Sequence, residues 1–248
     1  MGEKKGMSTI QETSFSIKVT YLIRNFLSRP LFRLLEGNLG RILDIGGGSF
    51  YKNLVNSSWS NYVVLEPDLN SLPKPNTLDK INSISADAGK SPIKNETFDT
   101  IIIIQVLQFI FEPIKVISEA HRILRKNGKL IIQVPQSGNL HGVPNHYYNF
   151  TRFWLERSLS DNKFKIVNYI PLGGAWRTIA SRLFLMFWPV MGHPYYLDDK
   201  FKKRGILFWI LFPIQLLVAI LFFVVSLILS ISDIKEEANN HLIVAVKI

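Results

Sequence analysis

Short apolar runs separated by polar turns dominate the first two thirds of the chain. Four of them, at residues 42–45, 62–65, 81–86 and 98–104, have the length and composition of buried β-strands. Each run ends in or is followed by a polar residue, in order Asp44, Glu66, Asp87 and Gln105. Ligands of open parallel sheets lie outside the carboxyl ends of the strands, so we expect these four side chains in one crevice.

A glycine turn follows the first run, in the segment ILDIGGGSF at residues 42–50. Glycines at positions 46–48 allow backbone angles closed to other residues and let a ligand lie against bare main chain. About twenty residues later, the run YVVL ends in Glu66-Pro67-Asp68, where an acid could accept hydrogen bonds from both ribose hydroxyls. The pattern predicts a pocket for a nucleotide-type cofactor.

These segments resemble the class I S-adenosylmethionine-dependent methyltransferases, specifically the type 11 group. ILDIGGGSF is similar to their first motif, VVLEPD to the second, ADAGKSPIKNETFDTIIIIQVLQFI to the third, and ILRKNGKLIIQVP to the following helix and strand. The resemblance covers roughly residues 40–170. It implies an α/β fold with a Rossmann-like seven-stranded sheet, helices on both faces, and a last strand, at 241–248, antiparallel to residues 164–170.

The resemblance also implies S-adenosyl-L-methionine as cofactor and a role for each matching residue. The glycine turn would approach the methionine portion, Asp44 would order its amino end, Glu66 would hold the ribose, and Asp87 with Ala88 would border adenine. Gln105 and Val106 would line the cofactor near the reacting methyl. The implied cofactor-binding set is Asp44, Ile45, Gly46, Gly47, Gly48, Glu66, Pro67, Asp87, Ala88, Gln105 and Val106. Two departures are Phe50 for the third glycine and Gln108-Phe109 for a frequent Glu-His pair.

The stretch HGVPNHYYNFT at residues 141–151 is similar to one in bacterial members associated with cell-surface polysaccharide synthesis. It has His146 and Asn149 where that pattern tends to have Asp and Arg. Imidazole can take a proton from an oxygen acceptor near neutral pH, so His141 and His146 are the candidate catalytic bases. Tyr147 and Tyr148 are the candidate substrate-binding residues, whereas His121 is expected at the surface.

The charge and composition narrow the classes of partner. The chain has 29 Lys and Arg, 19 Asp and Glu, a net charge of +10 and no cysteine, which excludes disulfides, thiolate zinc sites and iron–sulfur clusters. Residues 17–35 carry four basic residues and no acid among aliphatic ones, which favours a basic amphipathic helix with a break near Pro30. We expect an anionic membrane surface as partner, no nucleic acid and no bound metal. The alternative for this segment is a helix that packs over the cofactor site.

An uncharged apolar stretch at residues 206–231 is long enough to span a bilayer core of about 30 Å. It precedes the last strand, so a single crossing would separate that strand from its partner at 164–170. Residues 183–190 are too short for a second crossing, and two crossings would place the KFKKR cluster at 200–204 outside, against the positive-inside tendency. We therefore favour a re-entrant or in-plane hydrophobic hairpin on the cytoplasmic face of a membrane. A buried core helix is the alternative.

The expected organisation has three parts. Residues 1–40 form the basic helical segment, 41–172 with 239–248 the methyltransferase domain, and 173–238 the membrane-associating insertion. The expected activity is methylation of an amphiphilic or lipid-linked acceptor, foremost O-methylation of a glycan intermediate. An isoprenoid quinone-type methyltransferase and a non-catalytic methyltransferase-like membrane scaffold are the alternatives, and the oligomeric state stays open.

Overall fold

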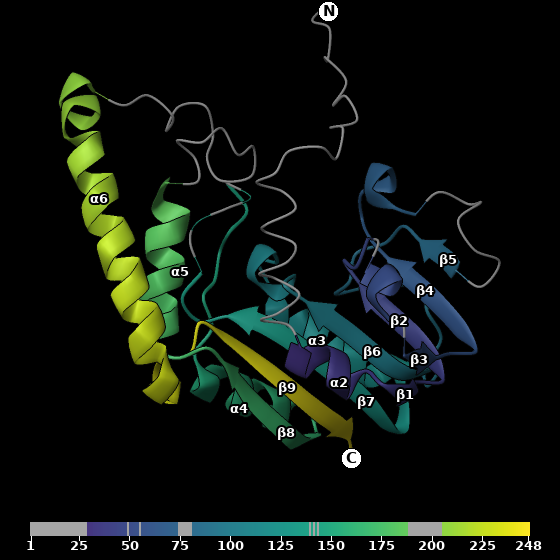
Figure 1. Ribbon diagram of the computed structural model, residues 1–248. Helices are drawn as coiled ribbons and strands as arrows, with labels where there is room; N and C mark the ends of the chain where they lie inside the picture. The colour runs from purple at the N-terminus through teal and green to yellow at the C-terminus, as the bar shows by residue number, and fades with distance from the viewer. Residues whose placement is uncertain are drawn as a thin grey trace, which may run out of the picture.

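A seven-stranded sheet in the order β5-β4-β2-β6-β7-β9-β8 forms the centre of the molecule (Figure 1). The computed structural model describes residues 29–48, 50–54, 56–73, 81–138, 140, 142, 144–187 and 205–248. The strands are β2 (Arg41–Ile45), β4 (Asn61–Leu65), β5 (Ile81–Ile84), β6 (Phe98–Ile104), β7 (Leu124–Pro135), β8 (Phe164–Leu172) and β9 (Asn240–Lys247). Two-residue strands β1 (Gly37–Asn38) and β3 (Ser57–Ser58) form a separate parallel pair. The predicted α/β class and sheet are confirmed, although β5 ends two residues earlier than expected.

The last strand, β9, lies between β7 and β8 and is antiparallel to both. His241 faces Val134 of β7 on one side and Pro171 of β8 on the other. The predicted antiparallel pairing of the C-terminal strand with residues 164–170 is therefore confirmed. The other pairings, from β5 across to β7, are parallel.

Helices cover both faces of the sheet. Successive side chains of the central strands point to opposite faces, so neighbouring residues belong to different buried clusters. Leu43 belongs to a buried cluster with residues of α3 (Pro113–Ile123) and α4 (Arg152–Asp161). Its neighbour Ile42 belongs to a second cluster that includes Leu31 of α2 (Arg29–Leu34). Pro30 lies near the start of α2, and the part of the predicted basic helix before Arg29 is outside the described residues.

A pair of helices, α5 (Ala175–Phe187) and α6 (Ile206–Leu229), connects β8 to β9 and rises beyond the end of the sheet (Figure 1). The two helices pack against each other. The buried residues of α6 are Ala219 and Ser226, seven positions apart and therefore on one face. Residues 188–204, with the KFKKR cluster, are outside the described part of the chain.

Most of the apolar surface of α6 is exposed. Within the described residues, the stretch Ile206–Ser232 is long and apolar enough to cross a membrane by length and composition, and 11% of its most apolar window is buried. The core helix of a soluble domain would pass the same test but would be mostly buried. Among the described residues, the low burial of this stretch disfavours the alternative of a buried core helix at 206–231. Pro213 lies inside α6 without ending it.

Candidate cofactor and acceptor site

Backbone hydrogen bonds join the carboxyl ends of neighbouring strands. Gly46 N donates to Leu65 O at 2.9 Å, Glu66 N to Ile84 O at 3.1 Å, and Gln105 N to Gln133 O at 2.8 Å. Three of the predicted cofactor residues, from three different strand ends, therefore lie along one edge of the sheet. This is the edge on which the crevice was expected.

The glycine turn after β2 is packed too closely for side chains at two positions. A Cβ atom at Gly46, whose φ is +70°, would lie 2.6 Å from a methyl of Val106. A Cβ at Gly47 would lie 1.6 Å from Asp44 Oδ2. The first contact places the glycine turn against Val106, the second residue after β6. The second contact places the turn directly against the side chain of Asp44.

Asp44 is fully buried at the end of β2. Its Oδ2 accepts a hydrogen bond from the Tyr62 hydroxyl, and its Oδ1 has no hydrogen-bond partner among the described residues. Burial raises the pKa of Asp44 to about 7, and the hydrogen bond from Tyr62 opposes that rise. A buried carboxylate oxygen without a donor is costly to keep, so this oxygen is suited to receive a polar or cationic ligand group.

The acid after β4 is half-buried. Burial raises the pKa of Glu66, whereas hydrogen bonding lowers the pKa of the neighbouring Asp68, whose carboxylate accepts from the N–H of Asn70 at 3.0 Å. Asp68 thus caps its own turn, the 3-10 helix Leu69–Ser71. The Glu66 carboxylate itself accepts a hydrogen bond from the backbone of Asp68, and it is the acid of this motif that we expect to hold the ribose.

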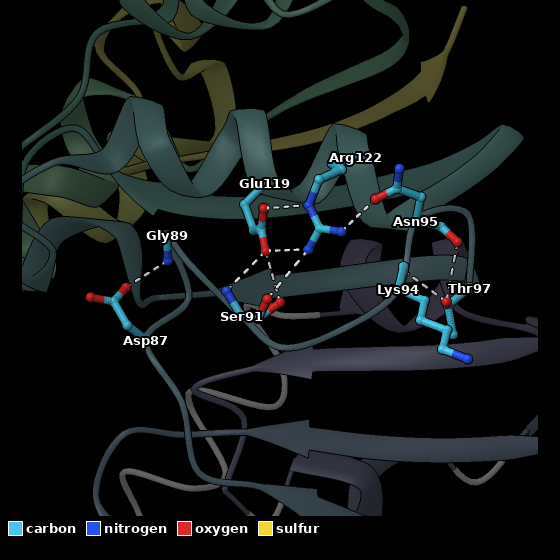
Figure 2. Close-up of polar contacts among 8 residues, drawn as sticks. All are labelled: Asp87, Gly89, Ser91, Lys94, Asn95, Thr97, Glu119 and Arg122. Carbon is cyan, nitrogen blue, oxygen red and sulfur yellow. Dashed lines mark hydrogen bonds and ion pairs between the residues drawn. The ribbon is translucent and has the colours of Figure 1, made fainter.

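The loop after β5 is clamped to α3 by hydrogen bonds to an ion pair within that helix (Figure 2). Glu119 Oε1 receives hydrogen bonds from the Ser91 amide at 2.9 Å and the Arg122 guanidinium at 2.6 Å. Arg122 also donates to Asn95 Oδ1 at 2.6 Å, and Asp87 accepts from Gly89 N at 2.6 Å. The clamp fixes the loop that begins with Asp87 and the buried Ala88, the residues implied for adenine.

Gln105 follows β6 with a φ of +58°, a left-handed conformation that is uncommon outside glycine. Its side chain is held at both ends: Nε2 donates to Asn240 Oδ1 at 2.8 Å, and Oε1 accepts from Gln108 Nε2 at 3.2 Å. Gln108 is fully buried. The carboxamide of Gln105 is therefore fixed beside Val106 at the edge of the crevice.

The loop that carries His146, Tyr147 and Tyr148, here called the acceptor loop, is joined to the Gln105 network. Tyr147 N donates to the carbonyl of Gln108 at 2.8 Å, and Tyr148 OH donates to Phe111 O at 2.8 Å. His146 Nε2 lies 3.1 Å from Tyr148 O, and its ring packs edge-on against Phe109. If Nε2 carries the proton, Nδ1 is the basic nitrogen. The structure thus brings His146, Tyr147 and Tyr148 next to the Gln105 network, while His141 lies outside the described residues.

His121 does not lie free at the surface, contrary to expectation. Its ring packs edge-on against Phe164 at 5.3 Å, and its Nε2 is buried. Burial lowers the pKa of His121. It lies on α3 and packs against β8, so it is partly buried rather than fully exposed.

Sequence reasoning missed Tyr62, and it missed Asn240, which orients Gln105. Tyr62 lies diagonally from Asp44 on the neighbouring strand, since Asp44 pairs with Val64 and Ile42 with Tyr62. The strand register would have revealed this pair. Asn240 lies 135 positions from Gln105 and reaches it because β9 inserts beside β7.

The comparisons agree with this geometry. Residues 43–132 match the family described as a methyltransferase domain. The methyltransferase solved with its Trm112 activator from Haloferax volcanii matches with a TM-score of 0.57 at 11% identity, covering 96% of this chain and 99% of that one. The phosphoethanolamine N-methyltransferase 2 of Haemonchus contortus, solved with S-adenosylhomocysteine, matches with a TM-score of 0.55 at 15% identity, covering 91% and 52%.

A third structure, the [4+2]-cyclase SpnF, matches with a TM-score of 0.54 at 13% identity, covering 96% of this chain and 84% of that one. The fold therefore also occurs in a protein described by another reaction, and likeness at such identities shows the fold alone. Among curated proteins, none matches this sequence significantly.

The domain match at residues 43–132 and the fold together support S-adenosylmethionine-dependent methyltransferase activity. The described residues fit this cofactor: bare glycine main chain lies over a buried acid with an unpartnered oxygen. When bound, the cofactor supplies a methyl group on an electrophilic sulfonium. The protein's residues must then orient an acceptor and exclude water, and no covalent nucleophile is needed.

Proposed function

We propose that this methyltransferase works at the cytoplasmic face of a membrane and methylates a hydroxyl of an amphiphilic or lipid-linked glycan intermediate. The single observation that carries this proposal is the exposed apolar surface of α6. Exposed residues on this helix include Trp209, Ile214, Leu217 and Leu221. Contiguous apolar surface of this extent is typical of a membrane or protein contact.

The position of the helix pair links this surface to the crevice. The chain enters α5 directly from the carboxyl end of β8 and returns from α6 into Asn240, which holds Gln105. The α5–α6 pair therefore stands at the same edge of the sheet as the proposed acceptor site. A lipid-linked acceptor could reach the site from the bilayer without leaving it fully.

The pairing of β8 with β9 limits how the helices meet the membrane. Both strands belong to one sheet, so the chain must enter and leave the insertion on the same side of the bilayer. With 13 residues, α5 extends about 20 Å, which is shorter than a hydrocarbon core of about 30 Å. This supports an in-plane or re-entrant hairpin rather than two crossings.

His146 is our candidate for the base that receives the hydroxyl proton. Its backbone partner Tyr148 and its ring partner Phe109 fix the imidazole within the acceptor loop. Asp44, Ile45, the glycines at 46–48, Glu66 with Pro67, Asp87 with Ala88, and Gln105 with Val106 are our proposed cofactor residues. Tyr147 and Tyr148 would contact the acceptor.

Membrane association is tested by fractionation of cells expressing the full chain. We expect the wild type to stay in the membrane fraction after washing with high salt. A Leu217→Lys, Leu221→Lys variant changes two exposed positions of α6 and should move to the soluble fraction while keeping its affinity for S-adenosylhomocysteine. As a control, Lys126→Gln and Lys165→Gln together alter exposed charges on the sheet domain and should leave the distribution unchanged.

The acceptor is tested by incubating purified protein and isotopically labelled S-adenosylmethionine with membrane lipid extracts. Label in a glycolipid that survives mild base would support O-methylation of a glycan hydroxyl. Label in a prenylated quinone would instead favour the isoprenoid quinone alternative. Cofactor binding without transfer to any extract would favour a scaffold.

A further inference from the structure

The buried pair of Asp44 and Tyr62 has a geometry that bears on how the cofactor is held. Both side chains are fully buried, and the Tyr62 hydroxyl donates to Asp44 Oδ2. The two residues lie on adjacent parallel strands, β2 and β4, on the same face of the sheet. The hydrogen bond fixes which way the carboxylate plane faces.

Tyr62 is itself held rigidly. Its ring packs edge-on against Tyr51 at 6.0 Å and against Trp59 at 5.7 Å. A ring packed on two sides cannot swing its hydroxyl away, and a buried hydroxyl is costly without a partner. Because its ring is fixed, Tyr62 holds the Asp44 carboxylate in one orientation next to the glycine turn.

The two oxygens of Asp44 have different surroundings. Both oxygens lie so close to Gly47 that a Cβ there would overlap them, but only Oδ2 receives the tyrosine hydroxyl. Oδ1 has no hydrogen-bond partner within the described residues. Oδ2 thus accepts a hydrogen bond within the protein, whereas Oδ1 can accept one from a ligand.

We propose that Tyr62 is a positioning residue for the cofactor: it orients Asp44 so that Oδ1 receives the cationic ammonium end, and binding releases a proton from Asp44 to solvent. The inference rests on the proposed cofactor site. It adds to that site the positioning residue Tyr62 and the release of a proton when the cofactor binds. An unpaired buried carboxyl favours its neutral form, whereas a cation beside it favours the charged form. Binding therefore exchanges a proton for the ammonium group.

The neighbouring charges allow this exchange near neutral pH. Burial raises the pKa of Asp44 to about 7, so about half of the unliganded protein carries the proton there. Among the described residues, Tyr62 from β4 is the titratable group that faces Asp44, and Tyr51 faces Tyr62. The adjacent strand β6 contributes Ile102, and α2 contributes leucines.

The sign of the pH dependence follows. Below pH 7 the ligand must displace a proton, so affinity should weaken as pH falls and level off above about pH 8. The hydrogen bond from Tyr62 lowers the pKa of Asp44, so its loss in Tyr62→Phe should move the profile to higher pH. A shift of about one unit would reduce the charged fraction at pH 7 from about one half to about one tenth, a roughly fivefold loss of affinity.

The experiment is calorimetric titration of S-adenosylhomocysteine into detergent-purified full-length protein in buffers of different ionisation enthalpy. We expect the wild type to release about half a proton near pH 7. Tyr62→Phe should bind about fivefold more weakly near pH 7 and approach wild-type affinity near pH 9. Tyr51→Phe is the matched control, since it keeps the hydroxyl that bonds Asp44, and should bind like the wild type.

Two results would overturn the inference while leaving the cofactor site intact. One is tight wild-type binding whose heat does not depend on the buffer, and the other is a Tyr62→Phe pH profile identical to that of the wild type. Absence of binding by folded wild type at every pH would instead reject the proposed cofactor site as well. The wild-type proton release needs no substitution, so the test holds even if Tyr62→Phe fails to fold.

Discussion

The carboxylate of Asp233 caps the start of α5 by accepting a hydrogen bond of 2.8 Å from the N–H of Trp176. The same carboxylate lies 3.4 Å from the N–H of Arg177, and Ala175 N donates to the carbonyl of Ile234 at 3.0 Å. The chain leaving α6 therefore satisfies the free N–H groups at the start of α5. This contact closes the base of the helix pair.

Replacing Asp233 by alanine should loosen the base of the pair. Loss of a capping carboxylate costs about 1–2 kcal/mol, so we expect the free energy of unfolding to fall by that amount. Denaturant titration in detergent, followed by circular dichroism, measures it. Asp161→Ala removes an exposed ion pair with Arg157 and should cost less than about 0.5 kcal/mol. Equal losses in both variants would contradict the capping role.

Substitution of Gly47 tests the packing of the glycine turn. The Cβ of Gly47→Ala would overlap the Asp44 carboxylate, so either the acid or the turn must move. We expect affinity for S-adenosylhomocysteine to fall at least about tenfold, equivalent to about 1.4 kcal/mol. Gly205→Ala has no described atom within 4 Å of its new Cβ and should bind normally. Normal binding by Gly47→Ala would show that the turn is not closely packed in solution.

The clamp between Glu119 and Arg122 makes a prediction about the loop after β5. Arg122→Gln leaves the Ser91 contacts of Glu119 but removes the charge, and should cost about 1–2 kcal/mol of unfolding free energy. It should also weaken binding of S-adenosylhomocysteine, because the loop carries Asp87 and Ala88. Lys115→Gln, which breaks an exposed pair with Glu112, is the control and should change neither quantity. Unaltered binding by Arg122→Gln would show that the clamp does not contribute to cofactor binding.

The same clamp predicts how stability responds to acid. Hydrogen bonding from Arg122 lowers the pKa of Glu119 below its ordinary value of 4.5. The folded protein therefore binds this proton less readily than the unfolded chain, so the stabilisation is present above about pH 4.5 and is lost as pH falls below it. Glu119→Gln should be less stable than the wild type near pH 7, and the difference should shrink in acid. A constant difference from neutral to acid pH would contradict this assignment.

Much of the sheet could be predicted from the sequence because each strand carries its own signal. Asp44, Glu66 and Gln105 could be placed on one edge of the sheet because each lies at the polar end of an apolar run. The pairing of the last strand with residues 164–170 followed from the resemblance rather than from local pattern. It was confirmed, but the second pairing of β9, with β7, was not predicted.

The contacts that orient the site depend on registers and crossings that no local pattern specifies. Tyr62 reaches Asp44 only because the two strands pair in one register, since a slip by one residue would move it to the opposite face. Asn240 reaches Gln105 across the end of β7. His121 is partly buried because β8 brings Phe164 against that helix.

Asp44 should make the unliganded protein less stable as pH rises. Its pKa is raised from 3.8 to about 7 in the folded state, so the folded protein holds the proton more tightly than the unfolded chain. Stability should therefore fall between about pH 4 and pH 7 and stay lower above that, by about 4 kcal/mol, since a shift of about three pKa units is worth about 1.4 kcal/mol for each unit. Asp44→Asn carries no proton to lose and should be more stable than the wild type near pH 8, while binding S-adenosylhomocysteine more weakly.

Denaturant titrations of both proteins across this pH range measure the difference. Buried His241, whose pKa is lowered by burial, changes stability with the opposite sign, but it is common to both proteins and cancels in the comparison. A difference that does not change between about pH 5 and pH 8 would show that Asp44 stays charged throughout. A difference that grows with pH, joined to weaker ligand binding, would show that this acid is retained for binding at the expense of stability.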